Sequence, residues 1–315
     1  MKKNWYYFLL ALPLMLFTAC GDDDSDDEAP KNADTVVIND NGTTSNGSVY
    51  TPIDDKNFYL DHVKYTVEYG HLEVSGYDDA APNGAANIAA QVTLNGNTYA
   101  VITIGIEAFY GCTTLTSVSI PHSIIRIGDR AFSGCNALKI ITVDSRNAIY
   151  DSRENCNAII ETQTNTLIQG CQATTIPQSV KSIGSSAFYG CSSLTSISIP
   201  NGVVTFDSSA FYACTGLTSI TIPDNVVRLG NWCFAGCTQL TNLTLGSSLT
   251  NIGDQVFRGC PFLTAIHIKK ETPIELNNTF DPAVYLSAIL YIPKGCIEAY
   301  KAAEPWSAFQ NIIEE

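Results

Sequence analysis

The amino-acid sequence predicts a repeat solenoid whose coils stack in series and share a parallel β-sheet on one face. The first observation is a pattern, I-G-x-x-A-F-x-G-C-x-x-L-x-x-I-x-I-P, that recurs six times with a step of 23 residues and one interruption. The second is the alternation of L-x-x-I-x-I in each unit, which is typical of a short strand. Stacked strands of this kind would lie about 4.8 Å apart in the sheet. The units begin at Ile104, Ile127, Ile183, Phe206, Leu229 and Ile252.

A third observation is an apolar spine of one Phe and one Leu per unit. A single coil cannot bury these side chains, whereas stacked coils bury them in one continuous column. The column would consist of Phe109, Phe132, Phe188, Phe211, Phe234 and Phe257, with Leu115, Leu138, Leu194, Leu217, Leu240 and Leu263.

Two glycines of each unit, such as Gly128 and Gly134 in the second, predict tight turns with positive φ. The unit that begins at Phe206 departs at both places, where it has Asp207 and Ala213. Asp tolerates the left-handed region, whereas Ala enters it less easily. The requirement for positive φ at the second turn therefore stays open.

The amino terminus has the layout of a secretory signal. Two lysines precede an apolar run at residues 5–17, which is too short to span a bilayer as a helix. Residues 16–20, LFTAC, resemble the cleavage box of bacterial lipoproteins. The resemblance implies that residues 1–19 are a lipoprotein signal peptide and that Cys20 is lipidated. An ordinary signal peptide with a chance cysteine is the alternative.

Six carboxylates follow at residues 22–28. Such a run stays extended and solvated, so residues 20–50 are predicted to form an acidic flexible tether. The run resembles the surface-export signal of Bacteroides-type lipoproteins, which implies an outer-membrane, lipid-anchored protein exposed at the cell surface. The alternative is a solvated tether that carries no export signal, which would leave the protein facing the periplasm. No later segment has the roughly 18 apolar residues of a membrane span, so the lipid would be the only contact with the membrane.

Six of the other ten cysteines occupy one repeat position. Free cysteine there would act as a small buried hydrophobe, with disulfides between stacked coils as the alternative. Cys156 and Cys171 flank a hairpin turn predicted around Asn165 in the interruption, and they are the best candidates for a bridge. The repeated cysteines are Cys112, Cys135, Cys191, Cys214, Cys237 and Cys260.

Composition and motifs exclude several classes of function. With 31 acidic and 17 basic residues, the net charge of −14 argues against nucleic acid and against docking on anionic lipid. No cysteine or histidine spacing typical of a metal site occurs, and there is no nucleophile elbow, phosphate loop or paired acid motif. The sequence predicts a non-enzymatic protein without catalytic residues, bound metal or cofactor.

Two sets of side chains are candidate ligand-binding surfaces. Residues that flank the buried position of each strand would face outward on the concave sheet and form a neutral, hydroxyl-lined strand face. Small side chains that only keep the strands flat and soluble are the alternative. Residues near the repeat Phe would form an aromatic edge, which offers large amphipathic contacts or simply stiffens the stack. The strand face comprises Ser117, Ser119, Thr142, Ser196, Ser198, Ser219, Thr221, Asn242, Thr244 and His267, with Ile140 and Ala265 in the same rows. The aromatic edge comprises Tyr110, Tyr189, Tyr212 and Trp232.

The repeat, with its A-F-x-G-C core, resembles the BspA-like, or Treponema pallidum-type, leucine-rich-repeat family over about residues 58–315. The resemblance includes the interruption and the closing segment LYIPKG. We therefore expect an N-terminal β cap at 51–102, a leucine-rich-repeat solenoid at 103–275 with an insert at about 147–180, and a C-terminal cap at 276–315.

A helical lid is predicted within the C-terminal cap. Its apolar residues fall at helical spacing, and a solenoid needs an atypical end to shield its last coil. These residues are Ile297, Tyr300, Trp306, Phe309 and Ile313.

Members of this family are described as adhesins that bind host matrix proteins or other bacteria. The resemblance implies a non-enzymatic cell-surface lipoprotein that binds a protein ligand. A glycan-binding surface lipoprotein that assists nutrient uptake and a structural cell-envelope protein are the alternatives, because a repeat specifies a scaffold and not its ligand.

Overall fold

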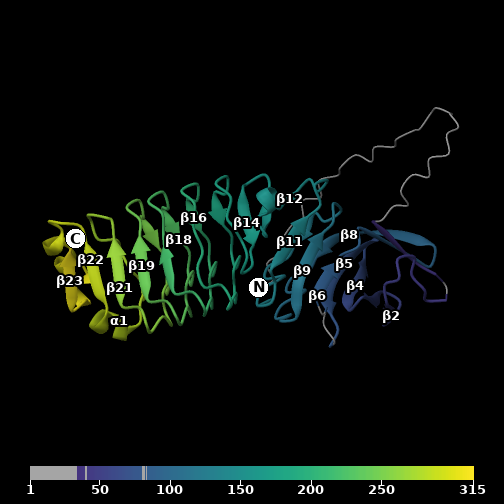
Figure 1. Cartoon of the computed structure of the whole chain (residues 1–315), viewed down its shortest axis with the longest axis horizontal. Coiled ribbons are helices and arrows are strands. Elements are labelled where there is room, and N and C mark those ends of the chain that lie inside the picture. Colours follow the sequence, from purple (N-terminus) through teal and green to yellow (C-terminus); the bar gives the residue numbers. More distant parts are fainter. Residues whose placement is uncertain (1–33, 40, 80–81, 83) are drawn as a thin grey trace, which may run out of the picture. The chain divides into compact units, whose positions relative to one another are not determined.

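The computed structural model describes residues 34–39, 41–79, 82 and 84–315, and Figure 1 shows their strands and helices. The predicted signal peptide, Cys20 and the tether up to residue 33 lie outside the described residues. The prediction that the tether extends to residue 50 differs from the structure. Strand β1 (Thr35–Ile38) pairs in parallel with β7 (Gln91–Leu94), and its Val36 and Ile38 are buried. Burial of these two side chains holds the segment against the sheet, although its polar composition suggested a linker.

The strands ahead of the repeats, apart from β6, form one mixed sheet. Its strand order is β1-β7-β8-β5-β4-β3-β2, and β10 also pairs with β8. The remaining bounds are β2 (Tyr50–Pro52), β3 (Asn57–Leu60), β4 (Val63–Glu68), β5 (His71–Tyr77), β8 (Asn97–Ile104) and β10 (Arg126–Ile127). Phe58, Tyr65 and Leu72 of this sheet belong to the same buried cluster as Phe109 of the first coil. The sheet is therefore continuous with the repeat core.

The coils contribute parallel strands to one face, which Figure 1 shows side by side. One group has the order β11-β9-β6 and the other β17-β19-β21-β22-β23. Paired residues in successive coils are 23 positions apart, as Ser219 with Asn242 and Asn242 with Ala265. Residues 194–199, which the pattern predicts to be a strand, form none, so the sheet is divided. The bounds are β6 (Gly84–Asn87), β9 (Leu115–Ile120), β11 (Ile140–Val143), β17 (Ser219–Thr221), β19 (Asn242–Leu245), β21 (Ala265–Ile268), β22 (Ile289–Ile292) and β23 (Asn311–Glu314).

A second sheet of short strands is formed by the residues at the start of each repeat unit, such as Ser182–Ile183. Its order is β12-β13-β14-β15-β16-β18-β20, parallel from β14 onward. The insert supplies the antiparallel hairpin β13–β14, and Asn165 in its turn has a φ of +55°. The bounds are β12 (Tyr150–Asp151), η1 (Arg153–Asn155), β13 (Ile159–Glu161), β14 (Thr166–Gln169), β15 (Ser182–Ile183), β16 (Thr205–Phe206), β18 (Arg228–Leu229) and β20 (Asn251–Ile252).

The phenylalanine rings stack from coil to coil, but not in one continuous column. Phe188, Phe211, Phe234 and Phe257 follow one another at centroid distances of 4.7, 5.0 and 5.4 Å. Phe132 belongs to a separate buried cluster. The insert is the reason, because the backbone of Gly170 lies against Phe188: a Cβ there would come within 2.2 Å of the ring. The predicted single spine is therefore two cores that meet at the insert.

The two repeated glycines serve different purposes. At the second position φ is positive, as in Gly134 at +75°, and Ala213 takes the same conformation at +55°. At the first position φ is not positive, contrary to the prediction. A Cβ on Gly128 would lie 2.4 Å from the backbone nitrogen of Ile106 in the preceding coil. The first position therefore requires glycine because the coils approach each other closely there, and not because the turn needs a positive φ.

The C-terminal segment mixes short helices with strands, and the helical lid predicted up to Ile313 is wrong at its end. Helices α1 (Pro282–Ser287) and α2 (Ile297–Ala302) are followed by the 3₁₀ turn η2 (Trp306–Ala308). Ile313 lies in β23, which pairs with β22. Pro305 cannot continue a helix because it lacks an N–H group, and β22 offers unpaired backbone groups at its edge. Trp306 is buried and donates its indole N–H to the carbonyl of Ile274 at 2.6 Å.

We predict that Phe211→Ala lowers the free energy of unfolding by about 3–5 kcal/mol, because a fully buried ring between two others is lost. Urea unfolding followed by circular dichroism measures the change. Phe262→Ala is the matched control, since Phe262 is 56% exposed, and it should cost less than about 1 kcal/mol. Equal losses for the two variants would show that the stacked rings are not the core.

Candidate binding surfaces

Most residues of the predicted strand face lie on parallel strands, but these strands belong to two separate sheets. Ser117 and Ser119 lie beside Ile140 and Thr142 on β9 and β11. In the larger sheet, Ser219, Asn242 and Ala265 form one row, and Thr221, Thr244 and His267 form the next. All of them are exposed or half-buried, and they alternate with buried side chains of the same strands. Ser196 and Ser198 are exposed, but they lie in the segment without a strand that separates the two sheets.

Strands β22 and β23 extend the strand face beyond the predicted residues. Tyr291 lies beside His267, and Ile313 lies beside Tyr291. The rings of His267 and Tyr291 stack at a centroid distance of 4.3 Å, and Nδ1 of His267 lies 2.9 Å from Oε1 of Glu315. This end of the face is therefore more aromatic than the rows of Ser and Thr, and it carries the His267–Glu315 pair. The alternation in Ile289–Ile292 was a usable strand signal, whereas helical spacing concealed the role of Ile313.

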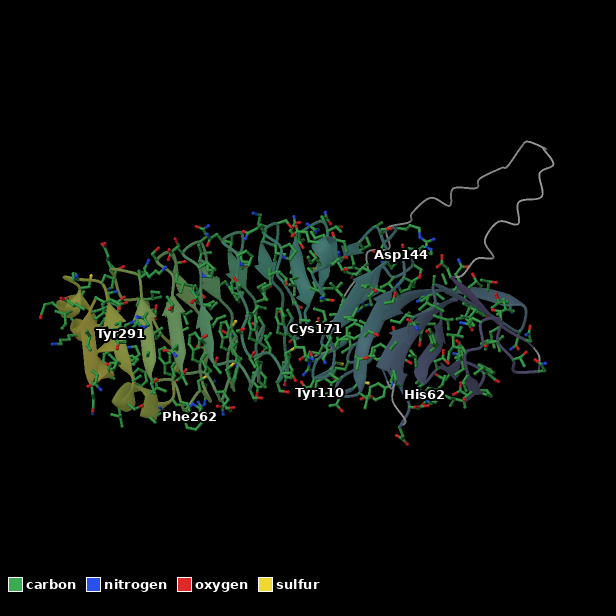
Figure 2. The ribbon with its side chains drawn as sticks, viewed as in Figure 1. His62, Tyr110, Asp144, Cys171, Phe262 and Tyr291 are labelled. Carbon is green, nitrogen blue, oxygen red and sulfur yellow. The ribbon has the colours of Figure 1, made fainter. Side chains whose placement is uncertain are left out.

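The four residues of the aromatic edge lie in one contiguous row. Centroid distances are 6.4 Å from Tyr110 to Tyr189, 4.8 Å from Tyr189 to Tyr212 and 6.5 Å from Tyr212 to Trp232. Tyr189 and Tyr212 stack nearly parallel, at 18°, so they cover each other's faces. Tyr110 and Trp232, at the two ends, are 42% and 39% exposed. Figure 2 shows Tyr110 and Phe262 along one edge of the stacked coils and Asp144 along the opposite edge.

Arg130 joins the aromatic edge as a cation. Its guanidinium lies 6.0 Å from the ring centroids of both Tyr110 and Tyr189, and it pairs with Glu107 at 2.6 Å. Such cation–π contacts contribute about 0.5–1 kcal/mol each at exposed sites. Burial raises the pKa of Tyr189, and its hydroxyl, like any tyrosine hydroxyl, is protonated at neutral pH. The edge therefore combines aromatic area, a cation and hydroxyl donors.

A cleft of about 240 Å³ opens beside Arg130, where the insert separates the second coil from the third. One wall is residues 127–131 and the other includes β14 and residues 184–186. Tyr150, Glu161 and Asp207 also line it. The interruption of the repeat thus places a polar recess next to the aromatic edge, a feature that the sequence pattern did not reveal.

The repeated cysteines are buried free thiols, and so are Cys156 and Cys171, which form no bridge. Each thiol of Cys135, Cys214, Cys237 and Cys260 donates to the carbonyl of the Phe 26 residues earlier, at 3.1–3.4 Å. The carbonyl of Phe188, for example, also accepts the backbone N–H of Cys191. Pointing at a carbonyl of the preceding coil, and not at the neighbouring sulfur, keeps the thiols apart.

One group of potential metal ligands occurs among the described residues, although no metal motif is visible in the sequence. Asp34, His122 and Asp144 each offer one ligand atom, and the three atoms lie within 4.8 Å of one another. They come from segments up to 110 residues apart in the sequence, which is why no spacing revealed them.

The fold and these surfaces define a class: a leucine-rich-repeat scaffold whose candidate surfaces are assembled from equivalent positions of successive coils. A match to the BspA type leucine rich repeat region covers residues 90–172 and 165–283, more than half of the chain. The protein therefore belongs to the BspA type leucine-rich-repeat family, as the sequence pattern indicated. This family is defined by its repeat and not by an enzymatic activity.

Three solved leucine-rich repeat proteins are similar to this chain. One from Bacteroides ovatus is 25% identical, with a TM-score of 0.43, over 82% of this chain and 76% of that one. One from Eubacterium ventriosum is 18% identical, with a TM-score of 0.49, over 78% and 84%. One from T. pallidum is 21% identical, with a TM-score of 0.37, over 76% and 92%. No curated protein gives a significant match. Among the described residues, no helix is long and apolar enough to cross a membrane.

We predict that iodoacetamide leaves Cys214 and Cys237 unmodified in the folded protein up to about pH 9, where a free thiol ionises. Burial raises the pKa of both thiols well above the usual value, so raising the pH adds no thiolate while the chain stays folded. Peptide mass spectrometry measures the modification, and the protein in urea is the positive control.

The same shift predicts the pH dependence of stability. Because the thiols ionise at lower pH in the unfolded chain than in the folded one, the free energy of unfolding should fall as the pH rises above about 9. Modification of Cys214 in the native protein at neutral pH would contradict the buried, neutral state.

Proposed function

We propose that this protein is a non-enzymatic, lipid-anchored cell-surface protein that binds a protein ligand, with the aromatic edge as its principal contact. The observation that carries the proposal is the contiguous row of Tyr110, Tyr189, Tyr212 and Trp232 with Arg130 alongside. Trp, Tyr and Arg are the residues enriched among those that dominate the energy of protein interfaces. Family membership supports a scaffold, since stacked repeats present extended binding surfaces.

The geometry of the row favours a protein over a glycan. A sugar ring stacks on the face of an exposed aromatic ring, but Tyr189 and Tyr212 use their faces on each other. Their edges and hydroxyl groups remain for polar and apolar contacts with a side chain. The recess beside Arg130, lined by Glu161 and Asp207, offers a place for a basic or polar anchor of the ligand.

The strand face supports a second contact region. Its hydroxyl rows would accept hydrogen bonds from a protein or a glycan, and its C-terminal end adds His267, Tyr291 and the 46% exposed Ile313. A glycan-binding lipoprotein working in nutrient uptake would use this face. A structural envelope protein would use neither surface for a soluble ligand.

The anchor is proposed from the amino terminus. Lipidation of Cys20 would give acyl chains that hold the protein in the outer membrane, and two chains suffice for stable anchoring. The acidic residues 22–28 would direct it to the cell surface. This location would expose the repeats to protein ligands of a host or of other cells.

Binding is tested by presenting the purified protein to a panel of extracellular-matrix proteins and, in parallel, to glycan arrays. For the protein ligand found, Tyr110→Ala combined with Trp232→Ala should weaken binding by about 30-fold or more, because truncation of a dominant interface residue costs about 2 kcal/mol. Tyr69→Ala is the control, because Tyr69 is 98% exposed and is not part of the edge.

Three other outcomes would argue against the proposal. Loss of protein binding only in Tyr291→Ala would move the contact to the strand face. Binding to glycans alone would favour the nutrient-uptake alternative. No binding in either panel, with unchanged cell adhesion after deletion of the gene, would favour the structural one.

A second experiment tests the anchor. Cys20→Ala should shift the protein from the membrane fraction to the soluble fraction of its native cells, since the thiol that carries the lipid is lost. Ser25→Ala, five residues away, should leave the protein in the membrane fraction. Digestion of intact cells with protease then reports whether the anchored protein faces outward; resistance to the protease would place it in the periplasm.

A further inference from the structure

Two coils and the first described strand bring three ligand-type side chains to one place. Asp34 directly precedes β1, His122 follows the end of β9, and Asp144 follows the end of β11. Asp144 is held at the end of its coil because its backbone N–H donates to the carbonyl of Ile120 at 2.9 Å. The three side chains therefore extend from the ends of β1, β9 and β11.

The imidazole of His122 has a nitrogen that its surroundings do not satisfy. Nδ1 is shielded from solvent and has no hydrogen-bond partner. It lies 3.7 Å from Oδ2 of Asp144 and 3.9 Å from Oδ2 of Asp34, which is too long for a hydrogen bond. A buried polar atom without a partner needs a physical reason.

Those distances are close to the separation of two ligands on one cation. At zinc–ligand bonds of about 2.0–2.1 Å, tetrahedral geometry places ligand atoms about 3.4 Å apart. A small inward movement of the three side chains would bring one imidazole nitrogen and two carboxylate oxygens to a common centre. Imidazole with carboxylate is a donor set that zinc accepts.

We propose that Asp34, His122 and Asp144 form a site for a zinc-type divalent cation that clamps strand β1 to the first two coils. Nδ1 of His122 would be the nitrogen ligand, and one oxygen of each carboxylate would complete three protein ligands. A fourth position stays open to water, as is usual when a protein supplies three ligands.

Arg146 is the competitor of the cation at this site. Its Nη2 lies 2.8 Å from Oδ2 of Asp34 and 2.6 Å from Oδ2 of Asp144, the same two oxygens. The side chain of Arg146 is 58% exposed, so it can turn into solvent when a cation arrives.

Titration of the purified protein with ZnCl₂ by isothermal calorimetry tests the site. We expect one zinc ion that His122→Ala loses, with affinity reduced by more than about 100-fold, because even an outer-shell partner is worth about 10–100-fold. His62→Ala is the matched control: His62 pairs with Asp78 elsewhere in the structure, and its removal should leave zinc affinity unchanged. Zinc should also raise the urea midpoint of the wild type but not of His122→Ala.

Arg146→Ala is a second test of the site, in which zinc affinity is expected to rise. A rise cannot result from misfolding of the variant, whereas a loss of affinity could. Removal of the competing guanidinium should tighten zinc binding by roughly two- to fivefold, the range that an exposed ion pair contributes. Equal zinc affinity in the wild type and His122→Ala would overturn the proposal, and so would weaker binding in Arg146→Ala. The absence of any zinc binding by the wild type would overturn it as well.

Discussion

Each coil of this protein can bury its phenylalanine and leucine only against the coils on either side of it. That constraint explains the regularity of the backbone, since rings stacked at 4.7–5.4 Å need coils that superimpose closely. It also explains the first repeated glycine, because a Cβ on Gly128 would meet the backbone of the preceding coil. The thiols of the repeated cysteines also hold neighbouring coils together. They fill the space beside each ring and donate to a phenylalanine carbonyl of the preceding coil.

The insert breaks this regularity, and the break is where the surface becomes distinctive. The backbone of Gly170 lies against Phe188, so the apolar core is divided in two. On the outside, the same junction opens the recess beside Arg130. Ser133, a small buried residue, holds the Tyr position of the second coil, and the rings of Tyr110 and Tyr189 approach one another from the coils on either side of it. The aromatic edge and the recess beside Arg130, the features most suited to ligand binding, therefore lie where the insert interrupts the core.

The ends of the repeat array contribute as much to its surfaces as the repeats do. At the end of the strand face, strands β22 and β23 place Tyr291, Ile289 and Ile313 in the rows that hold Ser, Thr and Asn in the coils. At the other end, β1 carries Asp34 to His122 and Asp144 of the first two coils. Strand β23 pairs with the edge strand β22 of the parallel sheet, and β1 pairs with the edge strand β7 of the mixed sheet, because an open sheet edge offers backbone partners to one more strand.

The sequence by itself determined the family, the in-register stacking and the residues of the aromatic edge, because a fixed step along the chain becomes a fixed position in a stack. Within the candidate surfaces it identified Tyr110, Tyr189 and Tyr212, which directly follow the repeat Phe of their coils, and Trp232, which precedes Phe234 by two residues. Only the tertiary structure decided that Ile313 belongs to a strand, that Val36 and Ile38 are core, and that Asp34, His122 and Asp144 meet. Local periodicity carries no information about which distant segment fills an open sheet edge, since that pairing depends on contacts between residues far apart in the chain.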